Sequence, residues 1–201
     1  MTVQPVYIDD IIGQITQDAI NAIVVKPSTT LLEQIKANEI AATGSSLIQQ
    51  LRFSKSSFDE LIETLSQADK SGVERYNKYP LAHLVQDMVI TRGSDAGIYG
   101  TATVNLIFMH QTMQAYKTDE RDDKVFKPVL WPIYYQFLEQ LKKNNWVFQT
   151  DATTGEFPHR VIKRAFWGNR KLEGSKLLLN DYVDAIEIQN LNLKINYSNC
   201  F

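Results

Sequence analysis

The chain has 201 residues, of which 44% are hydrophobic and 22% are charged, with 9 glycines and 6 prolines. These proportions are typical of a single globular domain, here residues 1–201, and they exclude a disordered chain and a collagen-like or low-complexity polymer. The formal net charge of −2, from 21 basic and 23 acidic side chains, provides no overall field that would select nucleic acid or an anionic membrane.

The cysteine count, the N-terminal segment and the lengths of the apolar runs bear on where the protein is found. Cys200 is the only cysteine, so an internal disulfide and a thiolate metal cluster are both excluded. The N-terminal segment MTVQPVYIDD lacks the basic region of a signal peptide, and no run approaches roughly 18 uninterrupted apolar residues. We therefore expect a soluble protein that is made in the cytoplasm and has no membrane span.

The first predicted element is an amphipathic helix over residues 6–22, because isoleucines from Ile8 to Ile15 recur at a spacing of three or four. Residues 26–77 show the weakest secondary-structure pattern in the chain. Within this stretch, Thr30–Glu33 and Ser57–Glu60 both fit a capping box, in which the first and fourth side chains cap a helix start. The second box is followed by an apolar stripe and predicts a helix.

Extended structure is predicted from Pro80 onward. Residues 84–91 are strand-like, 92–97 are rich in turn formers, and 101–110 alternate apolar and polar side chains. Ile107 and Met109 make the second face of the 101–110 strand partly apolar, which indicates that both faces are covered. Together these segments predict a hairpin or an adjacent antiparallel pair.

A long helix that ends near Lys143 is predicted from the 3–4 spacing of large apolar side chains from Phe126 to Leu141. Pro132 cannot donate a backbone hydrogen bond, so the helix is expected to kink or to start late. A short strand at 146–149 and a loop at 155–158 follow. Residues 160–167 fit a helix or a strand.

The C-terminal strand alternates over residues 183–197, with a one-residue phase slip at Gln189 and Asn190. Such a slip turns the side chains to the other face unless a β-bulge absorbs the extra residue. A straight strand of this length would extend about 45–50 Å, which exceeds the width of a compact domain. The strand is therefore expected to bend, to fold back, or to project beyond the domain and pair with another subunit.

No catalytic, cofactor-binding or metal-binding residue is predicted. The three histidines, His83, His110 and His159, have no partner at metal-ligand spacing, and the sequence contains neither a phosphate-binding glycine loop nor a GxSxG elbow. A hydrolase would need one of these histidines to meet a nucleophile and a carboxylate. The charged run Thr118–Lys124 is expected to be a solvated helix entry.

The segment 159–171 combines cations with aromatic residues and contains no acidic residue. Three interpretations remain open: a nucleic-acid contact, a protein–protein hot spot, and a regular element whose cations surround core aromatics. A candidate interaction surface combines this segment with the aliphatic residues of the C-terminal strand. It comprises Arg160, Lys163, Arg164, Phe166, Trp167, Ile186, Ile188, Leu191 and Leu193.

The order of predicted elements resembles that of the tail-terminator and tail-completion proteins of tailed bacteriophages, which are α+β subunits at the head–tail junction. The resemblance is carried by Lys78–Leu81, the strand through Val104 and Phe108, Phe126 with Pro132–Tyr134, Trp167–Gly168 and Asp184–Ile195. It covers residues 78–196 and the first helix.

The resemblance implies an α+β fold in which an antiparallel or mixed sheet packs against an N-terminal helix and a long central helix, with a long C-terminal strand. It implies a virion structural protein without catalysis or cofactor, in a homo-oligomeric ring of six or more copies. The partners that it implies are the tail tube and the portal or connector proteins, with DNA only passing through the lumen. The alternative function is a nucleic-acid-binding module that uses residues 159–171.

Overall fold

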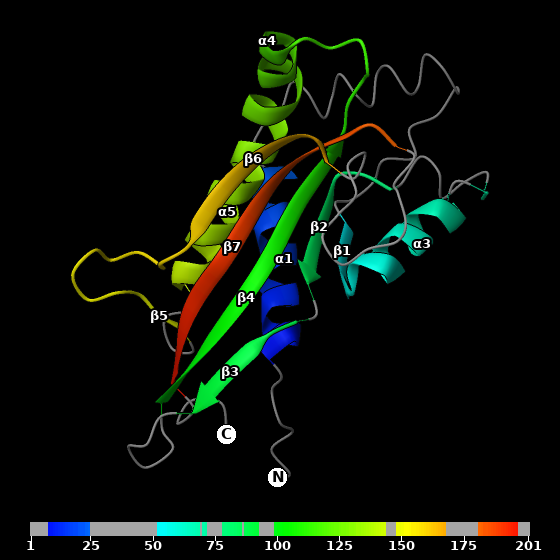
Figure 1. Cartoon of the computed structure of the whole chain (residues 1–201). Helices are drawn as coiled ribbons and strands as arrows, with labels where there is room; N and C mark the ends of the chain where they lie inside the picture. Colours follow the sequence, from blue (N-terminus) through cyan, green and yellow to red (C-terminus); the bar gives the residue numbers. More distant parts are fainter. Residues whose placement is uncertain are drawn as a thin grey trace.

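The computed structural model describes residues 8–24, 52–68, 70–71, 78–85, 87–92, 99–143, 148–167 and 181–196. The predicted cap at 30–33 and most of the predicted turn at 92–97 lie outside these residues. The described part has the predicted α+β fold, with a mixed sheet and a long C-terminal strand (Figure 1).

The sheet is built around two long antiparallel strands, β4 (Tyr99–Gln111) and β7 (Val183–Asn196). The outer edge of β4 pairs with β2 (Leu81–Val85) near one end and with β3 (Val89–Arg92) near the other. The outer edge of β7 pairs with β6 (Arg160–Trp167) and β5 (Phe148–Gln149). Strand β1 (Arg52–Ser56) extends the sheet by parallel pairing with β2. The predicted strand at 84–91 is thus two strands, each antiparallel to β4.

Two helices cover one face of the sheet, which we name the helix face. They are α1 (Ile8–Val24), which confirms the predicted N-terminal helix, and α5 (Trp131–Lys143), and both lie behind the sheet in Figure 1. The main core lies between them and the sheet, where Val104, Leu106 and Phe108 of β4 are fully buried. The predicted stripe from Phe126 to Leu141 supplies the helical side of this core.

The central helix consists of three consecutive segments. It begins with α4 (Thr118–Arg121) and continues as a wide π-helical segment, η2 (Asp122–Leu130), before α5 begins at Trp131. The Trp131 N–H donates to the Phe126 carbonyl, five residues back. Pro132, which has no N–H to donate, therefore lies where the wide π-helical segment changes to the regular α-helix of α5. No helix in the described part of the chain is long and apolar enough to cross a membrane.

The phase slip in β7 is a β-bulge, which is one of the outcomes that the alternation allowed. Val104 pairs with Leu191 and Leu106 pairs with Ile188, so Asn105 alone lies opposite Gln189 and Asn190. Asn190 has a φ of 53°, and its N–H donates to Asn105 Oδ1 at 2.8 Å. The bulge keeps the aliphatic side chains on both sides of it on the helix face, so the strand bends and stays paired with β4 along its whole length.

Among the described residues, the opposite face of the sheet is covered by a helix at one end only. Helix α3 (Phe58–Ala68) buries Leu61 and Leu65 against a second core cluster that includes Met109, which confirms that both faces of β4 are covered there. The predicted capping box starts α3: the Ser57 N–H donates to Glu60 Oε2 at 3.0 Å. Near β3 this face carries exposed polar side chains such as Thr101 and Asn192.

Candidate interaction surface

The aliphatic half of the predicted interaction surface is buried in the core. Its four members, all fully buried on the helix face, are Ile186, Ile188, Leu191 and Leu193. Strand β7 has a neighbour on each edge and helices over its face, so these side chains cannot meet a partner. This part of the prediction is wrong, because alternation in a strand shows which residues share a face and not whether that face is covered.

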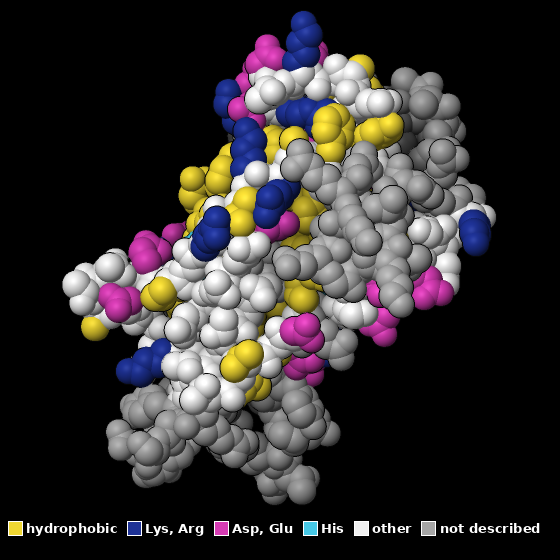
Figure 2. Space-filling model, in the orientation of Figure 1, with side chains coloured by type: hydrophobic (Ala, Val, Ile, Leu, Met, Phe, Trp, Pro, Cys, Tyr) yellow, Lys and Arg dark blue, Asp and Glu magenta, His cyan; other side chains and the backbone are white. Residues whose placement is uncertain are grey.

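The basic and aromatic half forms β6, so the segment 160–167 is a strand. Among the described strands β6 pairs with β7 alone, which makes it an edge of the sheet. The side chains of Arg160, Lys163 and Arg164 are exposed, whereas Trp167 is buried. Figure 2 shows lysine and arginine side chains gathered in the upper part of the molecule, in the region of β6 and the start of the central helix.

Two of the three β6 cations are held by carboxylates of the same chain. Lys163 forms an ion pair with Asp122 of η2, and its ammonium lies 4.4 Å from the centre of the Phe126 ring. On the other face of β6, Arg164 Nε lies 3.3 Å from Glu187 Oε2. Within the described residues Arg160 makes no ion pair. The local positive charge is therefore smaller than the sequence indicates.

The two aromatic residues of β6 have structural partners. Trp167 packs against Phe58 of α3, with ring centroids 6.2 Å apart, and its indole N–H donates to Glu187 Oε1 at 2.9 Å. Phe166 is half-buried, and its ring centroid lies 5.8 Å from that of Tyr182. A base could stack on Trp167 only if the α3 contact opened, so this geometry does not favour a nucleic-acid contact through the tryptophan.

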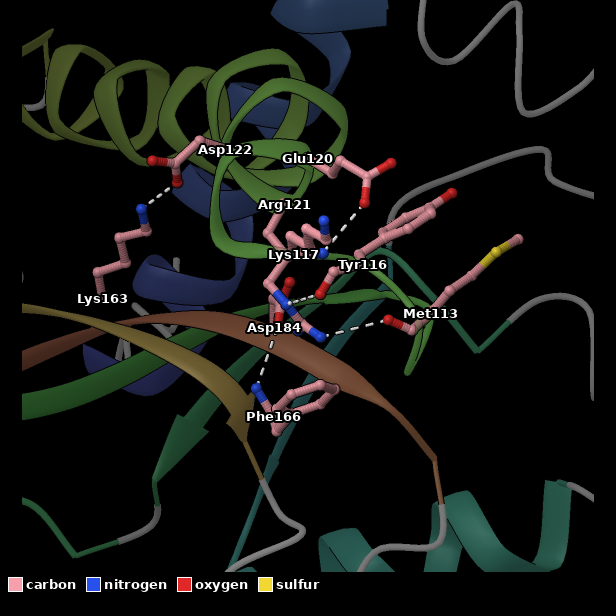
Figure 3. A network of polar contacts seen from close by, with 9 residues as sticks. All are labelled: Met113, Tyr116, Lys117, Glu120, Arg121, Asp122, Lys163, Phe166 and Asp184. Carbon is pink, nitrogen blue, oxygen red and sulfur yellow. Dashed lines mark hydrogen bonds and ion pairs between the residues drawn. The ribbon is translucent and has the colours of Figure 1, made fainter.

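A buried ion pair beside β6 was missed by the sequence analysis. Arg121 is 4% exposed and Asp184 is fully buried, with Arg121 Nη1 2.7 Å from Asp184 Oδ1. The guanidinium also donates to the carbonyl oxygens of Tyr116 at 2.9 Å and Met113 at 3.3 Å (Figure 3). The prediction that residues 118–124 form a solvated helix entry is therefore wrong at Arg121, whose side chain points inward to the end of β7.

The backbone of β6 completes this network. The pairing of β6 with β7 is irregular between Arg164 and Trp167, and Phe166 there has a φ of 52°. In this conformation the Phe166 N–H donates to Asp184 Oδ1 at 3.0 Å, and the Phe166 ring lies 3.5 Å from the Arg121 guanidinium carbon (Figure 3). One carboxylate therefore ties together the start of the central helix, β6 and β7.

One signal in the sequence could have revealed the pair. Asp184 precedes Ile186 and Ile188 at the two-residue period of a strand, so it shares their buried face. A carboxylate at a core position needs a cation or several hydrogen bonds, because burying an unpaired charge is costly. Nothing in the local sequence identifies Arg121 as that cation, since 63 positions separate the two residues.

The three histidines come from three segments: His83 lies on β2, His110 on the neighbouring strand β4, and His159 just before β6. Burial lowers the pKa of His83 and of His110 from 6.5 to about 4, so both are neutral near pH 7. His83 Nδ1 lies 2.8 Å from Ser54 Oγ, and its buried Nε2 has no hydrogen-bond partner in the described structure. His159 Nε2 lies 2.8 Å from the Tyr134 hydroxyl. The described residues contain no group of three metal-ligating side chains.

Known proteins offer no further guide: no protein-family model, curated protein or solved structure matches this chain.

Proposed function

We propose that this chain is a structural virion protein of a tailed bacteriophage, which forms a homo-oligomeric ring at the head–tail junction as a tail terminator or neck protein. The order of elements from the N-terminal helix to the bulged C-terminal strand supports the proposal, since it is the order on which the resemblance rests.

The observation that carries the proposal is the exposed apolar edge of β3. Val89 is 65% exposed and Ile90 is 48% exposed, and among the described strands β3 pairs only with β4. Neighbouring side chains on a strand point to opposite faces, so both sides of this edge expose a β-branched residue. An open edge with exposed apolar side chains is suited to contact with another protein.

The sheet surface beside β3 supports the same proposal. On the face opposite the helices, Thr91 lies opposite Thr101 and Thr103 lies opposite Asn192, and the exposed Lys194 lies beside Thr101. The threonine and asparagine side chains can both donate and accept hydrogen bonds, as a wet protein interface requires. Figure 2 shows this lower part of the molecule as mostly uncharged polar side chains and backbone.

The experiment that tests the proposal is light scattering on the purified protein over a range of concentrations, followed by negative-stain imaging alone and with purified tail tubes. We expect ring-shaped particles of uniform mass that bind the ends of tubes. A protein that stays monomeric at high concentration and leaves tube ends bare would overturn the proposal.

A further inference from the structure

Two regions on different sides of the molecule carry exposed side chains of opposite charge. One is the exposed surface of α3, and the other is the outer edge of β6. Figure 1 shows the two elements on opposite sides of the β4–β7 pair. Figure 2 shows carboxylates and a cation near α3 at the right, and toward β6 it shows several cations with carboxylates among them.

The α3 surface is acidic. Glu60 and Glu63 are exposed on this helix, and neither makes an ion pair with the described residues. Glu63 accepts a hydrogen bond from the neutral Gln67 side chain at 3.3 Å, and the helix has no basic residue in its last turn. The side of α3 that faces away from the core therefore presents negative charge.

The β6 edge is basic and has an unpaired backbone in the described structure. Arg160 is exposed and unpaired there, and Lys163 and Arg164 keep 38% and 46% of their side-chain surface exposed beside their carboxylates. Cations along an edge strand discourage a second basic strand from pairing with it, because like charges would face each other. The same cations attract an acidic surface.

We infer that the acidic surface of α3 in one copy docks against the basic edge of β6 in a second copy, in a head-to-tail contact. The inference rests on the proposed function and identifies the contact between neighbouring subunits of the ring. Charge complementarity selects the second copy as the occupant, because both complementary surfaces belong to this chain.

The arrangement of the two surfaces determines the type of assembly. Because α3 and β6 are different surfaces, the contact leaves one of each unoccupied at the ends of a dimer. A heterologous contact of this kind closes into a ring when a whole number of equal rotations from copy to copy completes a full turn. In each contact, α3 of one copy would cover the open edge of β6 in the next.

Charge reversal separates this contact from other modes of assembly. Arg160→Glu places an acid on the basic edge, and Glu63→Arg places a cation on the acidic helix; neither change touches the buried ion pair. Each variant alone should self-associate at least tenfold more weakly than the wild type, because like charges would meet at every contact. A 1:1 mixture should assemble again when the two variants alternate. In one contact the helix that carries Glu63→Arg faces the edge that carries Arg160→Glu, and in the next the unchanged Glu63 faces the unchanged Arg160.

The measurement is particle mass by light scattering at low salt, with circular dichroism to confirm that each variant is folded. The matched controls Lys127→Glu and Glu139→Arg reverse exposed charges elsewhere on the central helix and should assemble like the wild type. Normal assembly of both single variants, or failure of their mixture to assemble, would overturn the α3–β6 contact and leave the proposed ring intact. A wild type that is monomeric under all conditions would overturn both.

Discussion

The two ends of the β4–β7 pair are held in different ways. At the end beside Arg121, the strands are joined to the central helix by a buried charge pair and to α3 by packing on the opposite face. At the end beside β3, the described residues pack against the helix face alone, through aliphatic side chains such as Leu191 and Leu193. The opposite face there is exposed and polar.

The difference indicates how the chain divides its surfaces. The Arg121 end pairs its buried charges within the chain, and the Asp184 carboxylate there also holds the backbone of β6 at Phe166. The β3 end leaves apolar side chains and strand edges exposed to other molecules. The predictions below test this division, beginning with the largest expected effect on stability.

Removing one member of the buried pair should be the most damaging change. Asp184→Asn leaves the Arg121 charge buried without its counter-charge, which typically costs about 3–5 kcal/mol of unfolding free energy. Urea denaturation measures the loss. Replacing both members, as Arg121→Met with Asp184→Leu, should recover much of it, because no unpaired charge remains.

The matched control for that experiment is Asp123→Asn, which breaks the exposed pair of Asp123 with Lys127. Solvated pairs contribute little to stability, so we expect no measurable change in the urea midpoint. An Asp184→Asn variant as stable as this control would contradict the role assigned to the buried pair.

The second prediction concerns pH. His83 and His110 are buried and neutral, with pKa values lowered from 6.5 to about 4, so the unfolded chain binds protons more readily than the folded one. Their contribution to stability is complete above pH 6.5 and is lost as the pH falls to about 4. Each residue accounts for roughly 3 kcal/mol at the low-pH limit, at 1.36 kcal/mol per unit of pKa.

Histidine variants separate the two contributions. Burial lowers the pKa of both rings to about 4, so we expect the two residues to make similar contributions. The slope of unfolding free energy against pH should fall for His83→Gln and for His110→Gln, and should fall furthest for the double variant. If urea unfolding between pH 4 and 7 gave equal slopes for the wild type and the double variant, neither histidine would contribute to the pH dependence of stability.

The β-bulge gives a third, smaller effect. Asn190 has a φ of 53°, a conformation that glycine adopts freely and β-branched residues avoid. Asn190→Val should lower the unfolding free energy by about 1–2 kcal/mol, while Asn190→Gly should be close to neutral. If thermal unfolding showed the two variants to be equally stable, the bulge geometry would be wrong.

The smallest effect on stability, with a large effect on assembly, is expected at the β3 edge. Changing Val89 and Ile90 together to threonine keeps β-branched side chains and removes exposed apolar surface. Unfolding free energy should change by less than about 0.5 kcal/mol, as for most surface substitutions. Binding to tube ends in negative-stain images should fall. Unchanged binding would show that the β3 edge takes no part in the proposed function.

The sequence alone determined the features that depend on local pattern. The 3–4 spacing predicted the helix face of α1 and of the central helix, and Ser57 with Glu60 predicted the start of α3. The phase slip at Asn190 marked the position of an irregularity in β7, and the β-bulge found there is one of the alternatives that the alternation left open.

Only the tertiary structure decided which charges and which faces are covered. Arg121 lies in a run of charged residues that looks solvated, and its burial follows from Asp184, which is 63 positions away in sequence. Strand alternation predicted that Ile186 and Leu193 share a face, but helices from distant parts of the chain determine that this face is the core. Charge pairing and burial depend on long-range contacts, which local periodicity does not record.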